Sequence, residues 1–169
     1  MDAPSFLAAR LDRGAAPLVV GDVIALILLL TVGTLNHQTV EFLTANPLYL
    51  LGVYAPFLIG WAAVAPFVGA YSAGAVETAK SSVPLVIRSW IPAAVVGLAL
   101  RAFVFRGGAE LTFAAVMLVL GSLALGGWRA LYFRLRYPPP FPPIPAAGPG
   151  LFTSRRPIAT AARAPSPDS

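Results

Sequence analysis

The sequence predicts an all-α integral membrane protein, folded as a bundle of four spanning helices. Its 169 residues are 57% hydrophobic and 11% charged, with a mean hydropathy of +0.76, whereas soluble domains carry about 25% charged residues. The apolar residues are gathered in four runs, each long enough to cross the roughly 30 Å hydrocarbon core of a bilayer as a helix. These predicted spans cover residues 17–36, 48–71, 83–105 and 111–133.

The first run follows Arg10 and Arg13, an order that is also typical of a signal peptide. We interpret the run as an uncleaved spanning helix, because it is too long for a signal peptide and no small-x-small cleavage site follows Leu35. We therefore expect a multi-pass protein of the cell membrane, in which residues 1–16 form a cytoplasmic segment and residues 17–136 the transmembrane domain.

Prolines interrupt the second and third runs. Pro56 and Pro66 lie in the second run and Pro92 in the third, and we expect a helix kink at each because proline removes a backbone donor. The pair in the second run also fits a discontinuous transporter helix, whose broken backbone binds solute. We favour kinked but continuous helices, since neighbouring helices re-satisfy the freed carbonyls.

Small and aromatic residues indicate how the spans pack. Small residues four apart let helix backbones approach closely. They occur as Gly21 with Ala25, Ala65 with Gly69, Ala93 with Gly97, and Ser122 with Gly126. Aromatic rings near span ends are predicted to lie at the membrane interface, where amphipathic rings prefer to be. These are Tyr49, Tyr71, Trp128 and Tyr132.

The last part of the chain, residues 137–169, is predicted to be a disordered cytoplasmic tail. It begins with the proline-rich stretch PPPFPPIPAAGPG, which favours an extended polyproline II spacer over a helix or a central strand. The remainder is rich in Ser, Arg, Ala and Pro and has too little apolar content to fold alone. Docking of a partner on this tail stays open.

The basic residues predict the orientation of the spans. Lys and Arg are enriched in the cytoplasmic flanks of membrane proteins. With the amino terminus inside, the outer side carries only Arg106, and we therefore place both termini in the cytoplasm. The inner side then carries Arg10, Arg13, Lys80, Arg134 and Arg136.

One carboxylate, Asp22, lies inside the first run and needs a partner, because an unpaired charge inside a membrane is costly. It lies about 8 Å from the cytoplasmic end of its run, and Arg88 in the third run lies at about the same depth. We therefore predict an intramembrane ion pair between Asp22 and Arg88. Arg129 is the second candidate partner, unless it snorkels to the headgroups. We interpret the pair as structural rather than catalytic.

Arg101 is predicted to lie on another face of the third run, near the outer interface. Glu110 and Glu41 are its candidate partners there. His37 and Glu41, four residues apart, also have the spacing of half a metal site, but no further ligand is nearby. We expect no metal and no cofactor.

Other classes of function are disfavoured by the composition. The absence of cysteine excludes disulfides, thiolate metal sites and a cysteine nucleophile. Phosphate-binding glycine loops, nucleophile elbows and paired carboxylates do not occur in the spans, so we predict a protein that is not an enzyme. The basic residues flank apolar runs instead of forming a soluble basic domain, which argues against a nucleic-acid partner.

Several segments resemble those of a known family. The first run carries Gly21 followed by Asp22, the second carries PFLIGW and APFVGAY, and the third carries RSWIPAAVVGLALRA. Over roughly residues 15–135 the chain resembles the family named domain of unknown function 3054, small four-span membrane proteins of prokaryotes. The resemblance implies the fold and the membrane location, and it brings no activity.

Two hypotheses about function follow. The first is a non-enzymatic structural or partner-binding unit, whose partners are the lipid bilayer and a second copy of the chain or another membrane protein. The alternative is an oligomeric transporter or channel for an anionic solute, lined by Asp22, Arg88 and Arg129. An enzyme acting on lipid is a distant third.

We expect a reporter fused after Ser169 to be found in the cytoplasm, because this orientation keeps most of the positive charge inside. Fusions to alkaline phosphatase, active only outside, and to a fluorescent protein, fluorescent only inside, measure the side. A matched fusion after Gly108, in the third connection, should give the opposite pattern. An exported carboxyl terminus would overturn the predicted topology.

Overall fold

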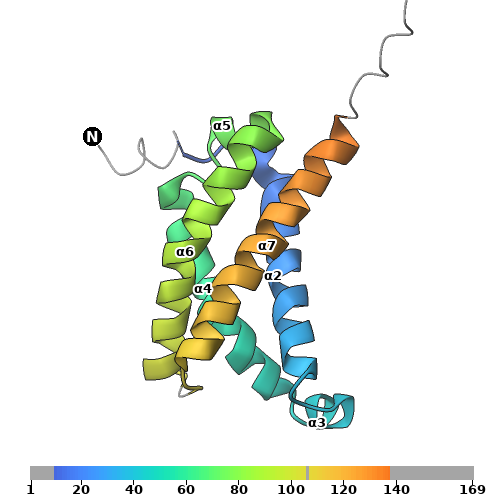
Figure 1. The fold of residues 1–169 in the computed structure, drawn as a ribbon, viewed down its shortest axis with the longest axis vertical. Coiled ribbons are helices and arrows are strands. Elements are labelled where there is room, and N and C mark those ends of the chain that lie inside the picture. The colour runs from blue at the N-terminus through green and yellow to red at the C-terminus, as the bar shows by residue number, and fades with distance from the viewer. Residues whose placement is uncertain (1–9, 106, 138–169) are drawn as a thin grey trace, which may run out of the picture. The chain divides into compact units, whose positions relative to one another are not determined.

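The computed structural model describes residues 10–105 and 107–137, and this part of the chain is helical without any strand. Four long helices run along the long axis of the bundle, and shorter helices occupy the connections (Figure 1). The long helices are α2 (Ala16–Leu35), α4 (Pro47–Val68), α6 (Ala79–Phe103) and α7 (Leu111–Arg136). The short ones are the 3-10 turn η1 (Arg13–Ala15), α3 (Val40–Ala45) and α5 (Ala73–Glu77).

All four long helices are long and apolar enough to cross a membrane, which confirms the predicted all-α, four-helix class. The third long helix, α6, begins at Ala79, four residues earlier than the predicted start of the third span. The reason is local: the side chain of Thr78 caps the helix by accepting a hydrogen bond from the N–H of Ser81. The predicted tail lies outside the described residues except for Tyr137, as do residues 1–9 of the amino-terminal segment.

Helix α6 packs against both α4 and α7, and α2 packs mainly against α7 (Figure 1). The contact between α4 and α6 is close because Gly60 on α4 faces the backbone of α6. A Cβ atom at Gly60 would lie 2.5 Å from the carbonyl oxygen of Ala93 and 2.9 Å from the nitrogen of Gly97. The small residues of α6 that the sequence singled out therefore form a helix–helix interface.

The prolines do not break the spans. Helix α4 continues through Pro56 and Pro66, and α6 continues through Pro84 and Pro92. The discontinuous transporter helix considered for the second span therefore has no counterpart in α4, whereas the kinks themselves stay a prediction.

The end of α4 is a glycine turn that sends the chain back into the bundle. Gly69 has a φ of 99°, a conformation that other residues adopt at a cost, and the N–H of Ala70 donates to the carbonyl of Ala65 over 3.0 Å. Tyr71 follows the turn and is only 5% exposed. The turn directs its ring into the bundle, and its predicted depth at the membrane interface stays a prediction.

The residues before η1 are tied to this turn. The guanidinium of Arg10 donates to the carbonyl of Phe67, and the N–H of Asp12 donates to the carbonyl of Tyr71 over 2.8 Å. These two contacts place residues 10–12 beside the α4–α5 connection.

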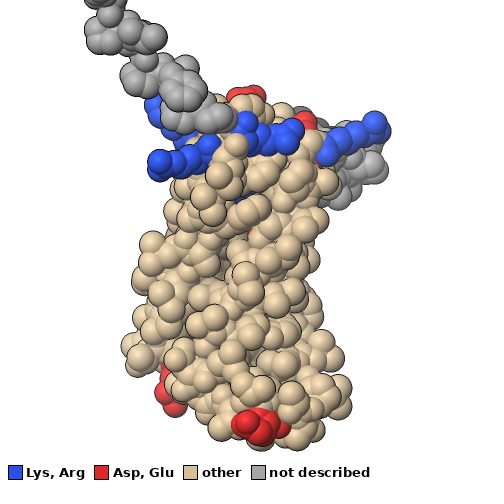
Figure 2. Space-filling model, turned by 90° about the vertical axis from the view of Figure 1, so that its right-hand side faces the viewer, with Lys and Arg blue, Asp and Glu red and all other residues tan. Residues whose placement is uncertain are grey.

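The two ends of the bundle differ in charge. On the face shown in Figure 2, Lys and Arg gather at the end of the molecule where α7 finishes, whereas acidic side chains are seen at both ends and are the charged side chains visible at the opposite one. We call the first the basic end, and the opposite one, where α3 lies, the α3 end. Four exposed residues of the basic end are Arg13, Lys80, Arg134 and Arg136. This asymmetry agrees in sense with the predicted orientation, which stays a prediction.

Replacing Gly60 by Ala should lower the stability of the bundle by about 1–3 kcal/mol, the usual effect of overpacking, because the new methyl group meets the backbone of α6. Thermal unfolding in a mild detergent measures the effect. Gly52→Ala in the same helix is the control, since a Cβ at Gly52 has no atom within 4 Å. That change should be neutral or slightly stabilising. Equal effects of the two changes would contradict the close α4–α6 contact.

Candidate functional site

A fully buried ion pair joins the first and the last long helix. Asp22 on α2 and Arg129 on α7 are both 0% exposed. The Nε of Arg129 donates to Oδ1 of Asp22 over 3.1 Å, and its Nη2 donates to Oδ2 over 2.6 Å. This is the bidentate geometry in which a planar guanidinium binds a carboxylate most strongly.

The third nitrogen of Arg129 connects the pair to the rest of the bundle. Its Nη1 donates to the carbonyl of Ala70, in the α4–α5 connection, over 2.9 Å, and to Oγ of Ser82 on α6 over 3.1 Å. Every nitrogen of the guanidinium and both oxygens of the carboxylate therefore have partners. We call the group Asp22, Ala70, Tyr71, Ser82 and Arg129 the Arg129 cluster.

Tyr71 closes the cluster on the side of α4. The guanidinium carbon of Arg129 lies 5.5 Å from the centre of the Tyr71 ring, within cation–π range. The Tyr71 hydroxyl accepts a hydrogen bond from Nε1 of Trp61 on α4 over 2.8 Å. All four long helices thus contribute to one polar network.

The positions of Asp22 and Arg129 along their helices explain why they meet. Asp22 comes six residues after Ala16, where α2 begins, and Arg129 comes seven residues before Arg136, where α7 ends. Both helix ends lie at the basic end, so the two side chains are at similar depths of about 9–10 Å.

Arg88 is not the partner of Asp22, contrary to the first choice of the sequence analysis. It lies on an exposed face of α6, and within the described ranges it has no ion pair. The equal depth predicted for Asp22 and Arg88 assumed a third span that begins at Val83. Because α6 begins at Ala79, Arg88 comes nine residues after the start of its helix, whereas Asp22 comes six residues after the start of α2, and the rotation of α6 was not predicted either. The buried face of α6 carries Ser82, Val86, Ser89 and Ala93, spaced three or four apart, and Arg88 is not on it.

Sequence reasoning missed Ser82, Tyr71 and Trp61 as members of this network. Ser82 was assigned to a connection because the third span was predicted to begin at Val83. The signal for it was the spacing from Ser82 to Ser89, seven residues, which places two small polar residues on one helix face. Tyr71 carried no local signal, because its inward direction depends on the turn at Gly69.

Arg101 and Glu110 do not form the pair considered from the sequence. The guanidinium carbon of Arg101 lies 5.1 Å from the centre of the Phe113 ring. Neither Glu110 nor Glu41 is within ion-pair distance of it in the part of the chain that the structure describes. Glu110 is exposed and precedes the first residue of α7.

His37 and Glu41 are both exposed in the connection that holds α3. Among residues 10–105 and 107–137 there is no group of three side chains able to hold a metal ion. Glu41 lies in the first turn of α3, where hydrogen bonds from the backbone and from Thr39 lower its pKa below the ordinary value. Its place is therefore that of a helix-terminus carboxylate.

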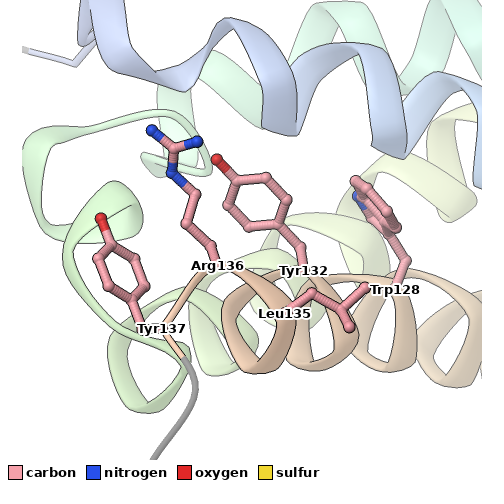
Figure 3. Close-up of a pocket in the computed structure, with 5 residues that line it drawn as sticks. All are labelled: Trp128, Tyr132, Leu135, Arg136 and Tyr137. Atoms are coloured by element: carbon pink, nitrogen blue, oxygen red, sulfur yellow. The ribbon is translucent and has the colours of Figure 1, made fainter.

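A hollow of about 520 Å³ lies beside the last turns of α7 (Figure 3). Its lining residues are Trp128, Tyr132, Leu135, Arg136 and Tyr137. The Trp128 indole packs directly against Gly21 of α2, where any side chain would collide with it. Aromatic rings and an arginine at the basic end of a span are typical of a membrane–water interface, and we interpret the hollow in that way.

The ion pair of the Arg129 cluster is thus fully buried, and Arg129 donates four hydrogen bonds inside the bundle. A buried, bidentate pair with further hydrogen bonds of this kind can hold helices in register.

Comparisons with known proteins agree with the motifs noted in the sequence. The model of the family described as "Protein of unknown function (DUF3054)" matches residues 19–132, a range that includes both Asp22 and Arg129. This confirms the family resemblance. No curated protein and no solved structure matches the chain.

Breaking the pair from one side should destabilise the bundle strongly. We expect Asp22→Leu or Arg129→Met alone to cost about 3–5 kcal/mol of unfolding free energy, because each leaves a buried charge unpaired. The double variant should cost clearly less than the sum of the two, with an incomplete rescue because Ala70 and Ser82 lose their donor.

Denaturant titration in detergent micelles measures the three free energies. Arg88→Met is the matched control, an identical substitution at an exposed position, and should change stability by less than about 0.5 kcal/mol. Strict additivity of the two pair variants would show that Asp22 and Arg129 are not coupled.

Proposed function

The chain belongs to the DUF3054 family of proteins of unknown function, and we propose that it is a non-enzymatic structural unit of the cell membrane, which assembles with a second copy of itself or with another membrane protein. The observation that carries this proposal is the Arg129 cluster. Its hydrogen bonds connect α2, α6, α7 and the α4–α5 connection to one another. Such a network favours a role in holding the bundle together over a role as a reaction site.

The energetics of the cluster support a structural role. Dehydrating an aspartate and an arginine costs several kcal/mol for each ion, and good geometry with added hydrogen bonds is needed to offset that cost. The cluster supplies both. Misregistered packings of the same helices would leave the two charges unpaired in a low-dielectric interior, so the pair discriminates against them.

The alternative, an anion path lined by Asp22, Arg88 and Arg129, is not supported by this geometry. Asp22 and Arg129 are fully buried and bonded to each other, whereas Arg88 lies on an exposed face. The three residues therefore do not line one surface of the chain.

Arg88 supports the partner-binding part of the proposal. It is exposed nine residues into α6, among apolar neighbours such as Ile91 and Val95 that are also exposed. An arginine in the middle of a spanning helix costs about 2.5–3.5 kcal/mol on insertion scales. A carboxylate or carbonyl group of an adjacent membrane chain would offset this cost, and we assign Arg88 to such a contact.

Extraction of the protein into polymer nanodiscs, followed by mass measurement of the intact particles, tests the proposal. We expect an assembly larger than one 17.6 kDa chain, and we expect Arg88→Met to shift it toward the single chain while thermal unfolding stays unchanged.

Lys80→Met, which removes an exposed cation at the start of the same helix, is the control and should leave the assembly intact. A single chain without any partner would contradict the proposal. Anion flux into liposomes that disappears in Arg88→Met would favour the transport alternative instead.

A further inference from the structure

At the α3 end, a cleft opens beside Arg101 and continues into the bundle. The cleft has a volume of about 540 Å³, and an inner cavity of about 150 Å³ adjoins it. The two share four lining residues, His37, Arg101, Phe113 and Val116, and therefore border each other along these side chains. A cleft of this size is in the range of small-ligand sites.

Arg101 holds an unsatisfied charge in the wall of this space. Its Nε is buried and has no hydrogen-bond partner, and no carboxylate of the described residues is within ion-pair distance. The side chain is fixed on two sides, by the ring of Phe113 and by Gly107, where an added Cβ would lie 2.9 Å from the guanidinium carbon. A partly buried guanidinium without a counter-ion is a site for an anion.

The inner cavity lies between spanning helices and is mainly apolar, with Thr34, His37, Tyr49 and Arg101 as its polar lining residues. Its walls include Leu29 and Leu30 of α2, Val53 of α4, and Met117 and Leu120 of α7. Water has few hydrogen-bond partners there, whereas an alkyl chain fits the lining. The polar mouth and the apolar interior together match an amphiphile with an anionic head.

We propose that this space binds a phospholipid, with its phosphodiester on the Arg101 guanidinium and the end of one acyl chain in the inner cavity. Glu110 stands at the rim of the cleft, so the two fixed charges, Arg101 and Glu110, complement a phosphate and an ammonium group. A zwitterionic headgroup such as phosphatidylethanolamine therefore fits better than an anionic one. In the predicted orientation, this lipid comes from the outer leaflet.

Binding of dioleoylphosphatidylethanolamine to the purified full chain, followed by mass measurement of the intact complex, tests the proposal. We expect one retained lipid, and about tenfold or greater weakening in Arg101→Gln, the loss expected for a hydrogen bond to a charged group. Arg134→Gln, at an exposed arginine of the basic end that does not line the cleft, is the matched control and should bind as the wild type does.

A second variant tests the inner cavity without touching a charge. Gly33 borders the cavity, and a Cβ there meets no atom within 4 Å, so Gly33→Leu should obstruct the acyl chain while thermal unfolding is unchanged. Gly127→Leu, equally free of neighbours but on α7 away from the cleft, is its control. Gly33→Leu keeps the proposal testable if Arg101→Gln does not fold.

Three further ligands separate the sources of binding. Dioleoylglycerol lacks the phosphate, and phosphoethanolamine lacks the acyl chains, so both should bind at least about tenfold more weakly than the complete lipid. Equal binding of phosphoethanolamine would assign the site to a soluble anion, and equal binding of dioleoylglycerol would remove Arg101 from it. Phosphatidylglycerol bound as tightly as phosphatidylethanolamine would contradict the complementarity with Glu110. Unchanged binding in both Arg101→Gln and Gly33→Leu would overturn the proposal.

Discussion

The bidentate contact between Asp22 and Arg129 is the interaction on which the rest of this structure depends. It holds the first helix to the last, and through the third nitrogen of the arginine it also holds the α4–α5 connection and α6. Helices in a membrane have no hydrophobic driving force toward one another, since lipid tails are as apolar as leucine. A polar network that is complete only in one arrangement therefore specifies the packing that apolar contacts leave open.

Close backbone approach supplies the second constraint. Gly60 lets α4 contact the backbone of α6, and Gly21 accommodates the Trp128 ring between α2 and α7. Gly60 acts at the contact between α4 and α6, whereas Gly21 and Trp128 directly precede Asp22 and Arg129, so their contact reinforces the Arg129 cluster near the basic end. The Arg129 cluster does not extend to the α3 end. Arg101 lies there without an ion pair to any carboxylate of the described part of the chain.

The sequence was sufficient for the class of the fold and the number of long helices, because these depend on composition and on the length of each apolar run. It was insufficient for the choice between Arg88 and Arg129, which depends on the rotation of each helix about its axis. A face of Ser82, Val86 and Ser89 encodes that rotation only weakly, since α6 is apolar around most of its circumference. The inward position of Tyr71 was not predicted for a different reason. It follows from the left-handed turn at Gly69, which is a property of the folded backbone.

The separation of Asp22 and Arg129 by 107 residues has a consequence for the synthesis and membrane insertion of the protein. Spanning segments leave the ribosome in order, so the carboxylate of the first helix enters the membrane long before the guanidinium of the fourth has been synthesised. Until then Asp22 has to remain protonated, hydrated near the surface or held by the insertion machinery. Completion of the chain thus coincides with neutralisation of its most costly group, and an incomplete nascent chain differs from the finished protein by an exposed polar defect that membrane quality control can recognise.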